Sequence, residues 1–128
     1  AENFSFRLAE KHLSSGRVVI VAGGIGRPYS THDSAAVLVA LELDCQVVLK
    51  STKVDGIYDK DPNKFTDAVK FDTLSYQEAV ENADIKVMDK AALGLAMEQR
   101  MPVVVFDLEE SGNILKAASG EAIGTQVS

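Results

Sequence analysis

The sequence predicts an α/β fold in which a mostly parallel sheet is flanked by helices on both faces. Three short apolar runs, dominated by β-branched residues, occur at residues 18–21, 47–49 and 103–106. Runs of this kind, bounded by polar or turn residues, are typical of strands buried on both faces. Helical patterns lie between them, and strands that alternate with helices favour parallel pairing through crossover connections.

The helices are predicted from apolar spacing and from their capping residues. Residues 4–13 have roughly helical apolar spacing, and residues 34–43 are rich in Ala and Leu, with Asp33 placed as an N-cap. Ser75 followed by Glu78 forms a capping box that opens a helix. The remaining predicted elements are helices over residues 76–81, 90–99 (after an Asp89 N-cap and before Pro102) and 111–118, and a strand over 123–127.

Length and composition narrow the possible functions. A chain of 128 residues fits one domain, and a net charge of −6 argues against a nucleic-acid-binding surface. The apolar runs are far shorter than a membrane span. The single cysteine, Cys45, cannot form an internal disulfide, which fits a reducing cytoplasm. His12 and His32 stand alone, so the chain has no cysteine–histidine cluster for zinc, and we assign no residue as a metal ligand.

A glycine-rich segment at residues 23–33 follows the first predicted strand and leads into a helix. Its glycines would let backbone N–H groups approach a phosphate, and the helix dipole would favour the negative charge. The dinucleotide-binding fingerprint fails here, because Tyr29 occupies the position of the third glycine. A plain glycine-rich turn closed by an aspartate cap stays an equal alternative on spacing alone.

A second polar segment, residues 50–62, follows the second predicted strand. It brings together lysines, hydroxyl groups, an aromatic ring and several carboxylates, which are suitable groups for holding a nucleoside triphosphate. A charged, solvated loop with Asp-Gly and Asp-Pro turns is the alternative. We expect residues 55–72 as a whole to form a long surface loop.

Four ordered motifs resemble those of a known family. Residues 53–58, Lys-Val-Asp-Gly-Ile-Tyr, with Asp61-Pro62 after them, resemble the nucleotide-binding loop of the amino acid kinase superfamily. The segment at residues 23–33 resembles the acceptor loop of bacterial UMP kinases, and residues 86–92 and 120–127 are similar to two further segments of that family. The likeness runs from about residue 18 to residue 127 in the expected order.

This resemblance implies transfer of the γ-phosphoryl group of ATP to UMP, with Mg²⁺ as cofactor, in pyrimidine nucleotide biosynthesis. It places Asp33 at the catalytic position, where an aspartate orients basic groups around the phosphoryl group. The ATP-binding positions fall on Thr52, Tyr58 and Asp61. The UMP-binding positions fall on Ile25, Gly26, Arg27, Pro28, Tyr29, Ser30, Thr31 and His32. Asp89 matches another acidic family position, although we assign it mainly to capping.

The resemblance also implies a cytoplasmic homo-oligomer, hexameric in the parent protein, with ATP and UMP as its partners and no contact with nucleic acid or membrane. Arg27 stands where the family usually has Asn, and His32 where it has Thr, which puts strict UMP specificity in doubt. The family's N-terminal phosphate loops have no counterpart here. We therefore expect residues 1–128 to be the C-terminal, nucleotide-binding portion of a single domain, inactive alone, with an exposed side on its sheet.

Other functions stay open at the level of sequence. Aspartokinases and glutamate 5-kinases of the same superfamily carry a similar Val-Asp-Gly-Ile-Tyr loop. The alternatives of another class are a non-catalytic nucleotide-binding module and a self-associating fragment without activity. The segment at residues 86–89 favours UMP kinase over aspartokinase and glutamate 5-kinase.

Overall fold

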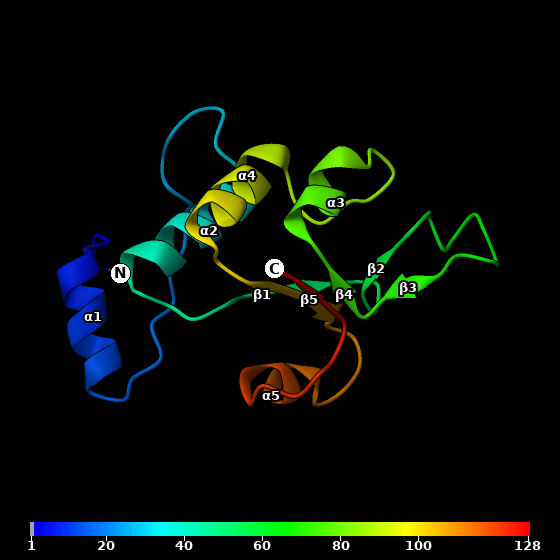
Figure 1. Ribbon diagram of the computed structural model, residues 1–128. Coiled ribbons are helices and arrows are strands. Elements are labelled where there is room, and N and C mark those ends of the chain that lie inside the picture. The colour runs from blue at the N-terminus through cyan, green and yellow to red at the C-terminus, as the bar shows by residue number, and fades with distance from the viewer. Residues whose placement is uncertain (1) are drawn as a thin grey trace.

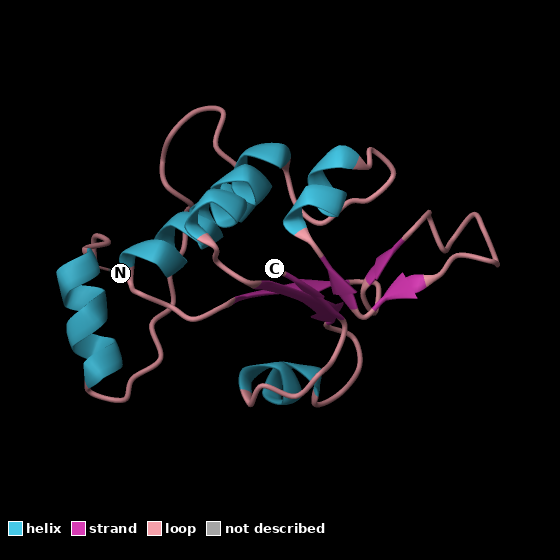
Figure 2. Ribbon diagram, viewed as in Figure 1, coloured by secondary structure: helices cyan, strands magenta, loops and turns pink. Residues whose placement is uncertain are grey.

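A computed structural model describes residues 2–128, and it confirms the α/β architecture. A four-stranded sheet in the order β1-β5-β6-β4 forms the centre (Figures 1 and 2). The helices are α1 (Phe6–Ser14), α2 (His32–Glu42), α3 (Tyr76–Glu81), α4 (Lys90–Gln99) and α5 (Asn113–Ala118). The strands are β1 (Val48–Thr52), β2 (Ile57–Tyr58), β3 (Lys70–Phe71), β4 (Thr73–Leu74), β5 (Val103–Asp107) and β6 (Thr125–Val127).

The sheet is mixed but mostly parallel. β1 pairs parallel with β5, in register from Val48 opposite Val103 to Thr52 opposite Asp107. β6 lies antiparallel to β5 and parallel to β4. The two long apolar strands therefore sit side by side, and the carboxyl end of β1 leads directly into the polar segment at residues 53–62.

Helices cover both faces of the sheet, as predicted. Figure 1 shows α2, α3 and α4 on one face and α5 on the other. α2 and α4 pack against each other, and small or β-branched side chains such as Val37, Ala92 and Ala96 are fully buried between the helices and the sheet. Short side chains let the two helix backbones approach closely. None of the helices in residues 2–128 is both long enough and apolar enough to cross a bilayer.

The strand predicted at residues 18–21 is wrong, because this segment belongs to no sheet. Val18 and Ile20 are 91% and 90% exposed. Within the described residues β1 pairs only with β5, so no neighbouring strand accepts the hydrogen bonds of residues 18–21. A segment with the composition of a strand does not form a strand unless another strand pairs with it. β1 is for the same reason not buried on both faces, and Leu49 is 38% exposed.

Asp33 is not the N-cap of its helix, which corrects a second prediction. Thr31 takes that position with extended backbone, and its Oγ1 accepts a hydrogen bond from the Ser34 amide at 3.1 Å. Asp33 lies in the first turn, with its carboxylate directed to another element. The capping box of Ser75 with Glu78 and the Asp89 N-cap of α4 are both confirmed.

Two other boundaries differ from the expectation. The helix predicted from residue 111 begins at Asn113 after Gly112, and the last strand begins at Thr125. The stretch at residues 55–72 is not wholly irregular, because β2 and β3 form a two-stranded antiparallel pair within it. Both differences arise from backbone pairing or conformation that local composition does not specify.

A buried threonine ties the β2–β3 pair to the main sheet. Thr125 is fully buried, and its hydroxyl accepts a hydrogen bond from the Ile57 amide at 2.8 Å and donates to the Phe71 carbonyl. Gly56 precedes this contact, and a Cβ there would lie only 2.7 Å from Thr125 Oγ1. The glycine is therefore required by the close approach of the loop to β6.

Candidate functional site

The glycine-rich segment forms an open loop that ends at the N-terminus of α2. Gly24 and Gly26 have φ values of 63° and 62°, a region that favours glycine. The loop surrounds a hollow of about 260 Å³. The residues that line it are Gly23, Gly24, Ile25, Gly26, Arg27, Pro28, Ser30, Thr31 and His32.

Seven of the eight residues predicted to bind the acceptor thus face one hollow; Tyr29 is the exception. Its side chain is fully exposed, and its backbone adopts a φ of 64°. A tyrosine in this left-handed conformation lets the chain turn between Pro28 and Ser30, with the ring directed to solvent. The hollow is polar, cationic at Arg27 and placed at a helix N-terminus, so it suits an anionic ligand.

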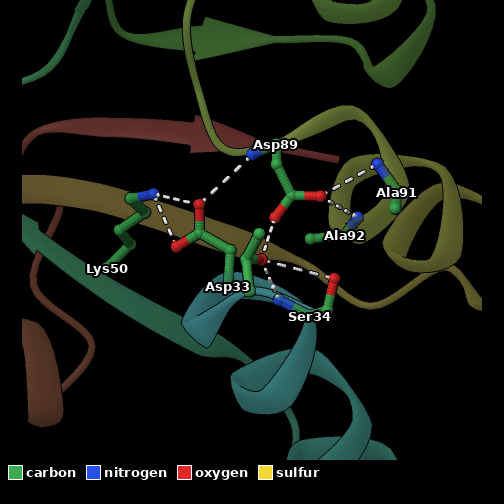
Figure 3. Close-up of polar contacts among 7 residues, drawn as sticks. Asp33, Ser34, Lys50, Asp89, Ala91 and Ala92 are labelled. Carbon is green, nitrogen blue, oxygen red and sulfur yellow. Dashed lines mark hydrogen bonds and ion pairs between the residues drawn. The ribbon is translucent and has the colours of Figure 1, made fainter. Parts of the chain in front are cut away.

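Asp33 holds the ammonium group of Lys50. Lys50 Nζ donates to both carboxylate oxygens of Asp33, at 2.7 Å each (Figure 3). The side chain of Lys50 is 24% exposed and that of Asp33 is 27% exposed, so the ion pair is partly shielded from water. Lys50 lies in the middle of β1, and Asp33 in the first turn of α2. The carboxylate therefore fixes one cation beside the acceptor loop, where the field of a charge is stronger than in bulk water.

Asp89 completes the polar cluster at this point. Its Oδ1 accepts hydrogen bonds from the Ala91 and Ala92 amides at 3.0 Å, and its Oδ2 accepts from the Thr31 hydroxyl (Figure 3). The Asp89 amide donates to Asp33 Oδ2 at 3.2 Å. Partial burial acts to raise the pKa of Asp89, but these hydrogen bonds and the charge of Lys50 together lower it below its ordinary value.

A larger cleft, of about 770 Å³, lies beside the β2–β3 pair. Tyr58 and Asp61, two of the three predicted ATP-binding residues, line it together with Phe65. Lys60 and Lys86 add positive charge to its walls. The cleft therefore combines aromatic surface, cations and a carboxylate, which suits a nucleotide.

Hydrogen bonds hold both predicted residues of this cleft in place. The Tyr58 hydroxyl donates to Asp55 Oδ1 at 2.7 Å, which lowers the pKa of Asp55 and raises that of Tyr58. Lys70, at 3.2 Å from Asp55, lowers the same carboxyl's pKa further. Asp61 accepts from the Asn63 amide at 3.0 Å, which holds the pKa of Asp61 below its ordinary value.

Thr52, the third predicted ATP-binding residue, is not among the cleft-lining residues. Its hydroxyl donates to the Val54 carbonyl at 2.7 Å and accepts from the Val54 amide at 3.2 Å. Thr52 and Lys50 are two residues apart on β1, so their side chains share one face of the strand. Thr52 thus shapes the turn that leads from the Asp33–Lys50 pair to the cleft beside β2 and β3.

The prediction from sequence did not include Lys50 or the lysine at residue 86 among the site residues. Lys50 was recognisable only as one of three lysines in the second polar segment, and nothing local distinguishes it from Lys53. In the folded protein α2 packs against β1 and Asp33 contacts Lys50, whereas Lys53 is exposed. The partnership of Asp89 with Thr31 was also missed, because it joins residues far apart in the chain.

The chain is similar to known proteins over almost its whole length. The chain is 53% identical to the uridylate kinase of Sulfurovum sp. (strain NBC37-1) and 51% identical to that of Wolinella succinogenes, each over 94% of its length. It spans about half the length of these relatives, 51% and 49% respectively.

The same likeness holds in three dimensions. The whole chain superimposes on the crystal structure of UMP kinase from Bacillus anthracis with a TM-score of 0.94 and 35% identity, and it covers 52% of that chain. The family model described as "Amino acid kinase family" matches residues 2–107, which is most of the chain. The chain therefore belongs to the amino acid kinase family.

Proposed function

We propose that the full-length protein transfers the γ-phosphoryl group of ATP to UMP, and that this chain is its C-terminal, nucleotide-binding portion. The observation that carries the proposal is the ion pair of Asp33 with Lys50 at the end of the anion-suited loop. The similarity to proteins named uridylate kinase and UMP kinase supports the choice of acceptor. We further propose a cytoplasmic homo-oligomer, which rests on the family resemblance of the sequence motifs alone.

Phosphoryl transfer depends on positioning and on stabilisation of charge at the phosphoryl oxygens. Lys50 supplies a fixed positive charge, and Asp33 keeps it in one orientation through two hydrogen bonds. The hollow at residues 23–32 would receive UMP, with Arg27 and the N-terminus of α2 beside its phosphate. The hydroxyl of Ser30 and the imidazole of His32 are the polar groups there that could contact the acceptor.

The cleft beside β2 and β3 would receive ATP. The ring of Tyr58 offers a stacking surface, and Lys60 and Lys86 offer charge to the phosphates. Magnesium fits such a site, because it keeps several waters and takes most other ligands from phosphates, with one or two carboxylates. Asp61, an exposed carboxylate of the cleft, is the candidate protein ligand. When bound, the ion would neutralise charge on the phosphates.

A comparison of acceptors tests this function. The full-length protein encoded by the gene is supplied with ATP and Mg²⁺ and, separately, with UMP, CMP, aspartate, glutamate or carbamate, and ADP release is followed. We expect turnover with UMP and little with the carboxylates or carbamate. Turnover of an amino acid or carbamate without UMP turnover would assign the protein to another branch of the family.

A further inference from the structure

The carboxylate of Asp89 does more than cap its own helix. Its Oδ1 alone accepts the two amide hydrogen bonds that cap α4. Its Oδ2 is used on Thr31, the last residue of the acceptor loop and itself the N-cap of α2. We call this contact the Thr31–Asp89 bridge. Capping α4 uses only Oδ1, so Oδ2 is left to accept from Thr31.

The bridge connects the loop to the rest of the molecule. Within residues 2–128, it is the only hydrogen bond that joins residues 23–31 to an element other than α2. The loop is otherwise exposed and contains three glycines, so its own conformational preference is weak. The backbone amide of Asp89 at the same time donates to Asp33 Oδ2. One residue therefore contacts both the acceptor loop and the aspartate that holds Lys50.

We propose that Asp89 is a positioning residue for acceptor binding: through the Thr31–Asp89 bridge it holds the loop at residues 23–31 in a fixed relation to the Asp33–Lys50 pair. This inference rests on the proposed function and gives Asp89 a role that it exerts through Thr31 and Asp33. Binding of UMP then requires little ordering of the loop, because the bridge has already ordered it. ATP binding in the cleft beside β2 and β3 does not depend on the bridge.

The contrast with α3 shows what capping alone looks like. Ser75 caps α3 and closes a capping box with Glu78 of the same helix, with no contact to the loop. Loss of that cap should therefore lower stability without affecting one substrate more than the other. Ser75→Ala is for this reason the matched control for variants at Asp89.

The test separates capping from bridging in the full-length protein. Asp89→Ser keeps a favourable N-cap for α4 but is too short to reach Thr31. Thr31→Val removes the hydroxyl, and Thr31→Ser retains it. We expect Asp89→Ser and Thr31→Val each to lower kcat/KM for UMP about tenfold or more, as for a lost hydrogen bond to a charged group. The KM for ATP should stay within about twofold, since the cleft is unchanged, and Thr31→Ser should retain most activity.

The pair should also behave as one unit. The double variant Thr31→Val with Asp89→Ser should be little worse than either single variant, because the same bridge is lost in each. Equal losses for ATP and UMP, or additive losses in the double variant, would overturn the proposal. A fall in kcat/KM in Ser75→Ala that was as selective for UMP as the fall in Asp89→Ser would also overturn the proposal.

A second readout does not depend on UMP being the acceptor. In the ligand-free protein, chymotrypsin should cleave the loop after the fully exposed Tyr29 faster in Asp89→Ser than in the wild type or Ser75→Ala, because the loop is no longer held by the bridge. An unchanged cleavage rate would contradict the positioning role. Failure of the wild type to phosphorylate UMP would instead contradict the proposed function, while faster loop cleavage in Asp89→Ser would still support the bridge.

Discussion

Lys50 is the side chain whose removal should affect phosphoryl transfer most directly. It is the cation that Asp33 fixes with two hydrogen bonds of 2.7 Å. Removal of one preorganised charge-stabilising donor commonly costs about a hundredfold or more in kcat. We expect that loss for Lys50→Met in steady-state kinetics of the full-length protein, with a much smaller change in the KM for ATP.

Lys116→Met is the control for this prediction, because α5 lies on the opposite face of the sheet (Figure 1). This variant makes the same lysine-to-methionine change. Among the described residues, the ammonium group of Lys116 forms an ion pair only with Glu110, at 3.9 Å. If Lys50→Met had the kcat of the wild type, or if kcat fell equally in Lys50→Met and Lys116→Met, the cation at Asp33 would have no part in the chemistry.

Tyr58 and Asp61 should matter for ATP rather than for UMP. Both line the cleft, and the stacking of a base on an aromatic ring is worth about 1–3 kcal/mol. We expect Tyr58→Ala and Asp61→Ala to weaken ATP binding about tenfold, measured by calorimetric titration, and to leave UMP binding nearly unchanged.

Tyr58→Phe distinguishes the ring from the hydroxyl, which is engaged by Asp55. The ring remains in this variant, so ATP affinity should stay close to that of the wild type. A titration in which UMP affinity fell most would show that the cleft belongs to the other substrate.

At the scale of elements, the β2–β3 pair depends on Thr125 of β6. The hydroxyl of this fully buried residue satisfies both the Ile57 amide and the Phe71 carbonyl. Thr125→Val keeps the shape but leaves both groups without a partner, at a cost of about 1–3 kcal/mol for each unsatisfied group. Denaturant unfolding should show this loss of stability, and the KM for ATP should rise because β2 carries Tyr58.

Thr125→Ser is the matched variant, since it retains the hydroxyl and loses one methyl group. It should cost about 1 kcal/mol and leave the KM for ATP unchanged. If Thr125→Val were as stable as the wild type, the hydroxyl could not be what joins the two sheets.

The elements also show what local sequence can predict. Capping is a local property, so the Ser75 capping box and the Asp89 cap were predictable from spacing alone. Pairing is not local: residues 18–21 have the composition of a strand but no partner within residues 2–128. The same dependence on distant contacts limited what the sequence could predict about the site. The segments at residues 23–33 and 50–62 were recognisable, but the packing of α2 against β1 that brings Asp33 to Lys50 exists only in the folded protein.

At the scale of the whole molecule, the chain spans about half the length of its relatives, and β1 has one edge without a partner in the described residues. We expect purified residues 1–128 to have negligible UMP-dependent ADP release. Catalysis in the full-length protein would use hydrogen-bond donors and cations on both sides of the phosphoryl group. When several of these groups are missing, their separate losses in rate multiply.

A coupled assay on the isolated chain checks this expectation, with the full-length protein as the positive control. The chain should retain measurable ATP affinity, because Tyr58 and Asp61 lie in one cleft. UMP-dependent turnover by the isolated chain that disappeared in Asp33→Asn would show that these residues alone complete the active site.

The central claim is that Asp33 and its cluster serve the transfer of phosphate from ATP to UMP. Its most direct test is the fate of γ-³²P label from ATP, separated by chromatography after reaction of the full-length protein with UMP. We predict that the label appears in UDP, and that Asp33→Asn lowers this transfer about a hundredfold or more because Lys50 loses its charged partner. Label that never enters UDP, or transfer that is unchanged in Asp33→Asn, would contradict the account.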